Sequence, residues 1–597
     1  MRYAFSAIVQ IDTDDWMIFK SPVRIMCADT VKDVLPLINE AENAVKNGQY
    51  AVIMLAYEAA PAFDSALETR PACGIPLIWV GIYDGAQRVQ SLPVATGSFE
   101  ARKWMSTTSQ ERYRDAIRRI KRYIAAGDTY QVNYTIRMIA QFSGDPYAFF
   151  CSLVKAQQSR HCAFLDIGKH VVCSASPELF LHLNGQKTIS RPMKGTYARG
   201  LTYSDDIDRE HTLMESEKNR AENIMIVDMV RNDLGRVAQP GSVKVAERFR
   251  VERFPTILQL TSTVEARISA SFTDILKAVF PCASITGAPK VRTMSIIREL
   301  EDTPRGVYTG SIGCLLPAVG RHGTMAHFNV AIRTVTIDTT HDTAEYGVGG
   351  GIIWDSSEEG EFAECLTKAA VLTSNVPDFD LLETMLWSPD SGYFLLALHM
   401  TRLKQSAYYF GYKYDEEIVA KTLISPVASF RNKPQRIRLI MSRDGKCRVE
   451  SNPIENNGQT IMKVGIALMP VNSRDPYLYH KTTHRYIYET AQKSRQDCDD
   501  VILYNEKKEV TEATRANVVI KERGKFYTPP ISCGVLGGTF RRYLLDSSAI
   551  EEQVISLDRL KSADRIYLIN SVRKWMTAKL AHSATNGTRQ TISIDNL

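Results

Sequence analysis

A break in the pattern at residues 374–378 constrains the fold more than any other feature of the sequence. A long helical pattern ends there, and a new segment opens at Phe379, just after Pro377. The chain has 597 residues, whereas a single hydrophobic core stops growing at about 250–300 residues. We therefore expect two globular units, residues 1–376 and residues 377–597.

Residue periodicity indicates the fold class of both units. Alternating apolar and polar residues with frequent glycine across residues 306–351 predict strands, and a helix is expected at residues 361–373. The first unit is therefore predicted to be α+β, with a mixed and mostly antiparallel core, and the second to be a smaller α+β unit.

Composition excludes several classes of protein. Hydrophobic residues make up 44% and charged residues 23% of the chain, which is typical of a soluble globular protein. A net charge of +6 is too weak and dispersed to indicate a nucleic-acid partner. A helix expected at residues 111–126 carries several arginines, which we interpret as a solvated face. No apolar run approaches the length of a membrane span, and eleven cysteines without a C-x-x-C pair are typical of reduced thiols in the cytoplasm.

Two predicted helices carry carboxylates that could share one site. Glu222 falls on an apolar stripe of a helix expected at residues 215–234. Glu361 and Glu364 share a helix face with Lys368. Three such carboxylates could supply the hard oxygen ligands that Mg²⁺ prefers. Taken alone, each has a plainer interpretation: a buried salt bridge for Glu222 and a solvated helix face for the pair.

A glycine-rich run and one lysine also have two interpretations. The glycines of residues 347–351 would let backbone N–H groups approach an anion, or would form a tight turn. Lys194 lies between Pro192 and Gly195. It is a candidate amine nucleophile if burial lowers its pKa, and otherwise a surface lysine.

A series of motifs runs in order from residue 127 to residue 370. It includes residues 127–133 (GDTYQVN), 176–178 (SPE), 192–196 (PMKGT), 220–223 (RAEN), 231–235 (RNDLG), 286–290 (TGAPK), 305–308 (RGVY) and 331–334 (AIRT). Together they resemble the chorismate-utilising enzymes, which include anthranilate synthase, aminodeoxychorismate synthase component I and isochorismate synthase. This resemblance implies a mixed α/β, sandwich-like first domain.

The resemblance implies roles for the residues above. Aminodeoxychorismate synthases carry a lysine at the position of Lys194 and anthranilate synthases an alanine, which argues against anthranilate synthesis. Lys194 would attack chorismate and expel the C4 hydroxyl, after which ammonia would give 4-amino-4-deoxychorismate. Glu178 would be the general acid and base. Mg²⁺ would bind Glu222, Glu361 and Glu364. The substrate would contact Thr286, Tyr308, Arg333, Gly350 and Lys368.

Two features of the sequence differ from those expected of an enzyme that catalyses the whole reaction alone. Gln259 stands where many family members have a histidine linked to proton transfer, and glutamine cannot relay a proton. A catalytically silent first unit that binds chorismate or acts as a scaffold therefore stays open. The chain also lacks the G-x-C-x-G elbow of a glutaminase, and Cys314 is interpreted as a core thiol. Ammonia is expected from a separate glutamine amidotransferase subunit.

The second unit carries a different series of motifs. They lie at residues 379–385, 398–403, 480–485, 510–518 and 534–541. They resemble the fold-type IV pyridoxal-phosphate enzymes, a group that contains amino acid aminotransferases and aminodeoxychorismate lyase. The resemblance implies a domain of two subdomains with pyridoxal 5′-phosphate as cofactor, and it is compatible with a homodimer formed through this domain.

This second resemblance also implies residue roles. Lys481 would form the Schiff base and then act as acid and base, while Glu512 would pair with the pyridinium nitrogen. The phosphate would be held by Arg402, Gly538, Thr539 and Phe540.

Lyase and aminotransferase share this machinery, so only the fusion separates them. A first unit that makes aminodeoxychorismate favours a lyase that releases pyruvate and 4-aminobenzoate for folate synthesis. An amino acid aminotransferase is the alternative.

Overall fold

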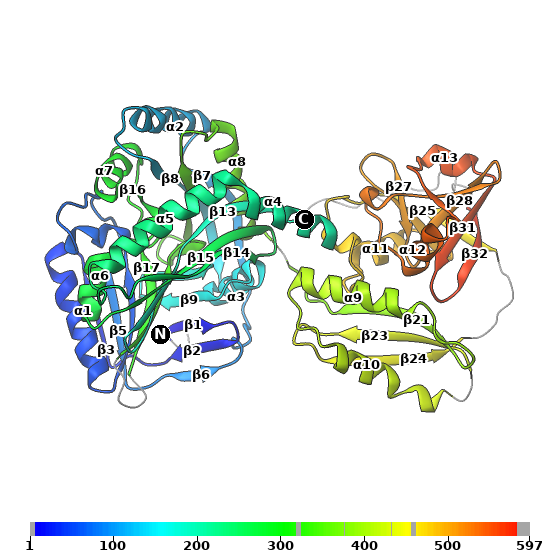
Figure 1. The fold of residues 1–597 in the computed structure, drawn as a ribbon, viewed down its shortest axis with the longest axis horizontal. Helices are drawn as coiled ribbons and strands as arrows, with labels where there is room; N and C mark the ends of the chain where they lie inside the picture. Colours follow the sequence, from blue (N-terminus) through cyan, green and yellow to red (C-terminus); the bar gives the residue numbers. More distant parts are fainter. Residues whose placement is uncertain (1–5, 318–323, 375, 431–432, 455–460, 582–597) are drawn as a thin grey trace. The chain divides into compact units, whose positions relative to one another are not determined.

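The computed structural model describes residues 6–317, 324–374, 376–430, 433–454 and 461–581. The chain divides into two compact units (Figure 1). The first comprises residues 1–199 and 209–376, and the second comprises residues 200–208 and 377–597. No helix in the described ranges is long and apolar enough to cross a membrane.

The first unit contains two ten-stranded sheets in which the strand pairings are antiparallel. One sheet contains β1 (Ala7–Asp12), β2 (Asp15–Phe19), β6 (Gln87–Val89), β7 (Phe99–Ser106), β8 (Gln131–Gly144), β9 (His161–Asp166), β10 (His170–Ser176), β16 (Gly287–Ala288), β19 (Thr334–Asp338) and β20 (Thr343–Ile352). The other contains β3 (Arg24–Ala28), β4 (Tyr50–Leu55), β5 (Ile78–Tyr83), β11 (Leu179–Asn184), β12 (Lys187–Arg191), β13 (Met193–Ala198), β14 (Lys244–Arg253), β15 (Ile257–Arg267), β17 (Ser311–Leu316) and β18 (Met325–Val330).

Helices cover the outer faces of both sheets. They are α1 (Val31–Lys46), α2 (Gln110–Ala125), α3 (Pro146–Gln157), α5 (Glu217–Gly235), α6 (Phe272–Val279), α7 (Lys290–Leu300) and α8 (Glu358–Ala369). Helix α4 (Tyr203–Glu215) is divided between the units, since residues 203–208 belong to the second. Along β1, Ala7 and Val9 pack between the sheets, while Ile8 packs in the cluster that contains residues of α2, α3 and α7. Successive strand residues point to opposite faces, so strands buried on both faces consist almost wholly of apolar residues. The predicted α+β class and the mostly antiparallel first unit are confirmed.

Capping residues explain where two predicted helices begin. Ser216 caps α5 by accepting a hydrogen bond from the Asn219 N–H, and Ser357 caps α8 in the same way. Glu215, which we expected to open the helix that carries Glu222, is the last residue of α4 instead. The expected helix at 361–373 begins earlier and ends at Ala369.

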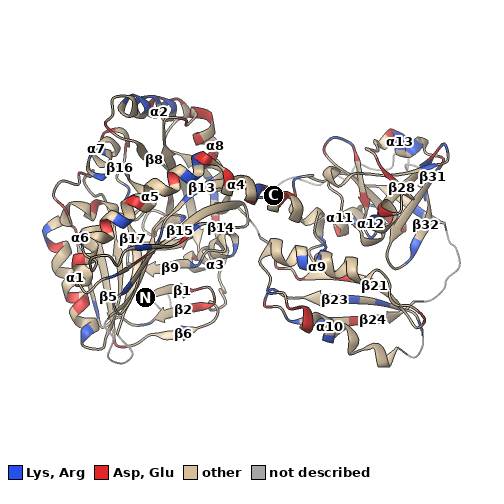
Figure 2. Cartoon of the chain, in the orientation of Figure 1, with Lys and Arg blue, Asp and Glu red and all other residues tan. Residues whose placement is uncertain are grey.

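The arginines of α2 are paired with acidic residues of other elements. Arg118 binds Glu358 at 2.9 Å, Arg112 pairs with Asp302, and Arg119 pairs with Glu299. In the cartoon of Figure 2, basic residues are coloured along α2 and acidic residues along α8. The solvated-face interpretation therefore fits these arginines.

The second unit contains a four-stranded and an eight-stranded sheet, which correspond to the two predicted subdomains. The smaller sheet contains β21 (Leu381–Ser388), β22 (Gly392–Tyr393), β23 (Gln435–Met441) and β24 (Cys447–Pro453). The larger contains β25 (Met462–Ile466), β26 (Asp500–Tyr504), β27 (Val510–Ala513), β28 (Asn517–Glu522), β29 (Lys525–Thr528), β30 (Glu551–Glu552), β31 (Arg565–Asn570) and β32 (Lys574–Leu580), and pairing of β27 with β28 makes it barrel-like. The helices are α9 (Leu396–Phe410), α10 (Glu416–Ile424), α11 (Tyr486–Ser494), α12 (Thr539–Asp546) and α13 (Leu557–Ser562).

Candidate active sites

In the first unit, Lys194 lies at a bulge of β13. Met193 pairs with Thr261 and Thr196 pairs with Gln259, so β13 carries one more residue than β15 across this stretch. Gly195 adopts a φ of +90°, which glycine tolerates best. An added Cβ atom at Gly351 of β20 would lie 3.0 Å from Lys194 Nζ. The bulge therefore brings the amine close to the glycine-rich run, which is part of strand β20 and not a tight turn.

Lys194 and Glu178 have pKa values that suit proton and amine chemistry. Burial lowers the pKa of the Lys194 amine, although Glu222 and Glu178 oppose that shift. Glu178 is 2% exposed, and burial raises its pKa to about 7, against the opposing effects of Ser284 and Lys194. Its Oε1 atom has no hydrogen-bond partner within the described part of the chain. This carboxyl group therefore keeps one oxygen available for a ligand.

Glu361, Glu364 and Lys368 all lie on α8. Glu364 forms a 2.7 Å ion pair with Lys368, whose Nζ also donates to Gly349 O at 2.8 Å. Glu361 accepts a 2.6 Å hydrogen bond from the Ser356 hydroxyl. An added Cβ atom at Gly350 would lie 3.2 Å from Glu361 Oε2. Glycine at this position thus lets the strand backbone lie close to α8.

The donor chemistry of these carboxylates fits Mg²⁺. Burial raises the pKa of both Glu222 and Glu361, and Lys194 and Glu364 interact electrostatically with Glu222. Carboxylates that share a buried site favour a cation between them. Across the described residues, however, no three acidic, histidine or cysteine side chains are gathered closely enough to hold a metal. Glu364 acts electrostatically on both Glu222 and Glu361, but the three carboxylates do not form a complete metal site in this structure.

Three further residues predicted to bind the substrate, Arg333, Tyr308 and Thr286, already contact other parts of the protein. Arg333, at a φ of +51°, donates from Nη1 to Lys368 O at 2.6 Å. Tyr308 packs against Gly347, where any side chain would overlap its ring. The Thr286 hydroxyl is fully buried and bonds the carbonyls of its own turn at 3.2 and 3.3 Å. Thr286 therefore supports the shape of the site more than it offers a free donor.

Two glutamines near Lys194 complete this site. Gln131, on β8, is 1% exposed, and neither its Nε2 nor its Oε1 has a hydrogen-bond partner among the described residues. A side chain at Gly351 would overlap the Gln131 amide as well as approach Lys194. We assigned Gln131 no role from the sequence, although it stands inside a motif between apolar residues. An unpaired buried amide indicates a ligand contact.

Gln259 contacts the bulge itself. Its Nε2 donates to Gly195 O at 3.1 Å, and its Oε1 accepts from the Thr196 hydroxyl at 3.2 Å. A bulge leaves ladder hydrogen bonds unmade, and this amide replaces them. Gln259 therefore holds the strand that carries Lys194.

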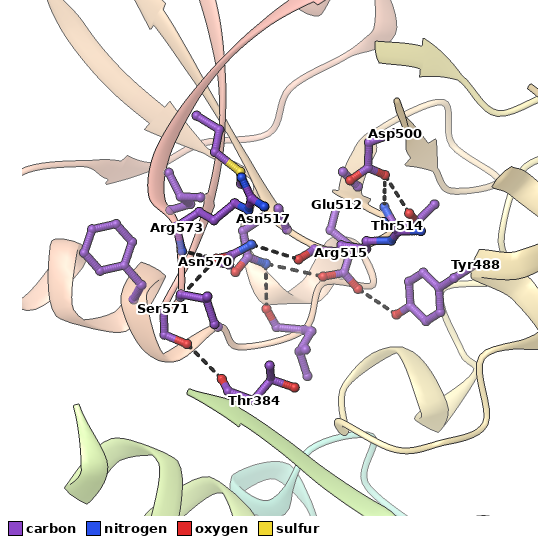
Figure 3. Close-up of a pocket in the computed structure, with 18 of the residues that line it drawn as sticks. Thr384, Tyr488, Asp500, Glu512, Thr514, Arg515, Asn517, Asn570, Ser571 and Arg573 are labelled. Atoms are coloured by element: carbon purple, nitrogen blue, oxygen red, sulfur yellow. Dashed lines mark hydrogen bonds between the residues drawn. The ribbon is translucent and has the colours of Figure 1, made fainter. Parts of the chain in front are cut away.

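The second unit contains a cavity of about 1640 Å³ that brings together every residue predicted to bind its cofactor. Figure 3 draws part of the lining, with Glu512 labelled. The lining of the cavity includes Arg402, Lys481, Glu512, Gly538, Thr539 and Phe540. It also includes several further basic residues, namely Arg436, Arg438, Arg485, Arg515, Arg565, Arg573 and Lys579. The excess of positive charge suits an anionic cofactor and an anionic substrate.

Lys481 and Glu512 have strongly shifted pKa values. Burial, reinforced by Arg402, lowers the pKa of Lys481 to about 8. Burial raises the pKa of Glu512 to about 7, against a hydrogen bond from Tyr488 at 2.7 Å. Asn517 donates to Glu512 at 3.4 Å (Figure 3). A buried carboxylate of this kind fits a protonated ring nitrogen, which would supply a charge-assisted hydrogen bond.

The loop before α12 fits a phosphate. A side chain at Gly538 would overlap the Asn517 side chain, so the backbone lies unusually close to β28 at the helix start. Thr539 opens α12, and the first N–H groups of a helix lack intrahelical acceptors. Arg402 donates from Nη1 to Gly537 O at 3.0 Å, which places a cation at the same loop.

The comparisons with known proteins agree with this division. Residues 5–374 match the family of chorismate binding enzymes, and the chain belongs to that family. Residues 380–580 match the amino-transferase class IV family, which implies pyridoxal phosphate as the cofactor of the second unit.

Individual relatives match the first unit. The chain is 42% identical over 281 residues to aminodeoxychorismate synthase component 1 of Klebsiella aerogenes, covering 47% of this chain and 61% of the relative. It is 40% identical over 300 residues to an anthranilate synthase component 1 of Haloarcula marismortui, covering 49% and 57%. The chain thus spans about three fifths of the length of these relatives. Anthranilate synthase component I of Streptococcus pneumoniae, 23% identical, shares the fold with a TM-score of 0.51 over 63% of this chain and 93% of that one.

Proposed function

We propose that the first unit aminates chorismate to 4-amino-4-deoxychorismate and that the second unit removes pyruvate from this product to leave 4-aminobenzoate. The observation that carries the proposal is a half-buried lysine, Lys194, whose amine pKa is lowered, beside a buried carboxyl group, Glu178, whose pKa is raised to about 7. The similarity to aminodeoxychorismate synthase component 1 supports the same assignment.

In the first unit, Lys194 acts as the nucleophile. Its Nζ forms a bond to the chorismate ring as the C–O bond of the C4 hydroxyl breaks, and Glu178 supplies the proton that leaves with the hydroxyl as water. Ammonia from a separate glutamine amidotransferase subunit then displaces the lysine amine. The raised pKa of Glu178 suits this role, because a general acid must hold its proton near neutral pH.

Other residues hold the substrate. Lys368 and Arg333 supply positive charge, and the unpaired Gln131 amide supplies a donor and an acceptor beside Lys194. Glu222, Glu361 and Glu364 would hold Mg²⁺, whose charge would help to bind a substrate carboxylate.

In the second unit, Lys481 and Glu512 have separate roles in proton transfer. Pyridoxal phosphate, when bound, would supply an electron sink for the substrate. Glu512 holds a proton on the pyridine nitrogen, and Lys481 Nζ removes the proton from C4 of the substrate. The C–O bond between the ring and the enolpyruvyl group then breaks, the ring becomes aromatic, and the released enolpyruvate takes up a proton to become pyruvate. A neutral amine is required to remove the C4 proton, and a Lys481 pKa near 8 keeps a useful fraction neutral.

The match to the class IV family also supports a second candidate, an amino acid aminotransferase, for this unit. The two activities differ in what they consume. A lyase needs only aminodeoxychorismate, whereas an aminotransferase needs an amino acid and a 2-oxo acid.

One assay distinguishes the candidates. The purified chain is supplied with chorismate, Mg²⁺ and a high concentration of ammonium, and the products are separated by chromatography. We expect 4-aminobenzoate and pyruvate in equal amounts. Accumulated aminodeoxychorismate would exclude the lyase. Transamination would then be tested with an assay for the 2-oxo acid product. Unchanged chorismate would contradict the proposal for the first unit and favour a silent binding module.

A further inference from the structure

A chain of hydrogen bonds reaches the start of α12 through two buried residues, Glu383 and His399. Glu383, on β21, is 1% exposed, and His399, on α9, is fully buried. Glu383 accepts two hydrogen bonds from Arg402, at 2.9 and 2.6 Å, and its Oε2 lies 2.6 Å from His399 Nδ1. His399 Nε2 lies 3.2 Å from Thr539 Oγ1. The chain is therefore continuous from Glu383 to Thr539.

The direction of these hydrogen bonds follows from the charge of Glu383. Burial alone would raise its pKa, but Arg402 and His399 bring the pKa down to about 2. An ionised carboxylate can only accept, so His399 Nδ1 carries a hydrogen. In neutral His399 the other nitrogen, Nε2, is then an acceptor, and the Thr539 hydroxyl must donate to it. The hydroxyl hydrogen is thus committed to histidine.

A phosphate next to Thr539 requires the opposite direction. The oxygens of a phosphate dianion accept hydrogen bonds, so Thr539 must turn its hydroxyl hydrogen toward the phosphate. That leaves Thr539 Oγ1 as an acceptor for His399, which can donate from Nε2 only when the imidazole is protonated. Glu383, Arg402 and Lys481 are the charged groups around this ring. A phosphate dianion would offset the two cations and favour the imidazolium form.

We propose that Glu383, His399 and Thr539 form a proton relay that couples phosphate binding at the start of α12 to the uptake of one proton from solution. The proton binds His399, His399 Nε2 then donates to Thr539 Oγ1, and the Thr539 hydroxyl donates to the phosphate. Glu383 and His399 are positioning residues, since they act through Arg402 and Thr539. The inference rests on the proposed function in that the phosphate is the one carried by the cofactor of this unit.

The test is isothermal titration calorimetry of the full chain, freed of cofactor, with 4-deoxypyridoxine 5′-phosphate. This probe lacks the aldehyde, so no bond to Lys481 contributes protons. Titrations at pH 8 in buffers of different ionisation enthalpy give the number of protons taken up. We expect the wild type to take up close to one more proton than His399→Gln. The glutamine amide can donate to Thr539 without being protonated, so its affinity should stay within about threefold of the wild type.

Thr539 supplies the matched pair of variants. Thr539→Val should lose the extra proton uptake and bind the probe about tenfold more weakly, whereas Thr539→Ser should keep both. Equal proton uptake by the wild type and His399→Gln would overturn the relay while leaving the cofactor assignment intact. Failure of the wild type to bind either the probe or pyridoxal phosphate would overturn the relay together with the proposed function of the second unit. Melting curves of the unliganded variants check that each is folded.

Discussion

Each unit surrounds a lysine amine with charged residues, but the balance of those charges differs between the two amines. In the first unit, the charged groups that act on Lys194 are three carboxylates, with Glu222 the strongest, and one cation, Lys368. In the second unit, Arg402 is the strongest charged neighbour of Lys481. Arg402 and Arg485 lower the pKa of this lysine, whereas Glu383 and Glu512 raise it.

Burial lowers the pKa of both amines, so the neighbouring charges decide how reactive each amine is. The carboxylates around Lys194 oppose the effect of burial, although the pKa of this amine is still lowered. Arg402 adds to the effect of burial at Lys481, whose pKa falls to about 8. A cation bound to these carboxylates would therefore lower the pKa of Lys194 further, whereas at Lys481 the protein's own Arg402 already has this effect.

The largest effect is expected from replacing Lys481, and this change should leave the reaction at Lys194 unaffected. Lys481→Ala should abolish the visible absorbance of bound pyridoxal phosphate and reduce pyruvate release by at least about 10³-fold. Aminodeoxychorismate should then accumulate at the wild-type rate, because Lys194 is untouched. Absorbance spectra and product chromatography measure both. Lys579→Ala, at the same cavity, is the control, and retained pyruvate release in Lys481→Ala would refute the role of Lys481.

Lys194→Ala tests the role of the lysine in the first unit. We expect aminodeoxychorismate formation to fall by at least about 10³-fold, or the product to change to anthranilate, while the cofactor absorbance stays unchanged. Lys187→Ala, which alters an exposed lysine that pairs with Glu265, should behave as the wild type. Undiminished aminodeoxychorismate formation in Lys194→Ala would rule out a covalent role.

Glu178→Gln should lower the amination rate by about 10²- to 10⁴-fold. Since the acid must be protonated to act and its pKa is about 7, wild-type amination should decline as the pH rises through 7. The variant should lose that decline, because glutamine does not titrate. The measurement is a pH–rate profile. Neutral ammonia is kept saturating at each pH, so that the ionisation of ammonia does not contribute to the profile. An unchanged decline in the variant would assign the titration to another group.

The smallest effect is expected at Gln259. Gln259→Ala removes the amide that bridges the bulge, so amination should fall by roughly tenfold while the pH–rate profile keeps its shape. Thr196→Val, which removes only one of the two contacts, should have a smaller effect. A change in the shape of the profile for Gln259→Ala would indicate proton transfer and contradict a purely positioning role.

Sequence motifs predicted the fold class and the chemically distinctive residues, because Lys194, Lys481 and Glu512 stand beside glycine or inside short ordered patterns. Residues that act through long-range contacts were not predictable in this way. Glu383 contacts Arg402 and His399 through folding of β21 against α9, and 16 or more residues separate the partners. The unpaired state of Gln131 likewise exists only once β8 and β20 lie side by side.

Helix boundaries show the same limit at a finer scale. We expected the helix that carries Glu222 to span residues 215–234, whereas the structure begins it at Glu217. Ser216 interrupts the expected helix, since its side chain satisfies the Asn219 N–H and starts a new helix. A single capping contact therefore determines which helix Glu215 belongs to.

The bulge at Lys194 and Gly195 also affects how insertions and deletions in this strand act. Met193 and Thr196 are three residues apart, yet their partners Thr261 and Gln259 are two apart. Removing one residue here would restore regular alternation and move the following side chains to the other face of the sheet. The face of the sheet toward which the reactive amine points thus depends partly on the number of residues in β13. Among natural variants of this strand, single-residue length changes should be rarer than substitutions of comparable size.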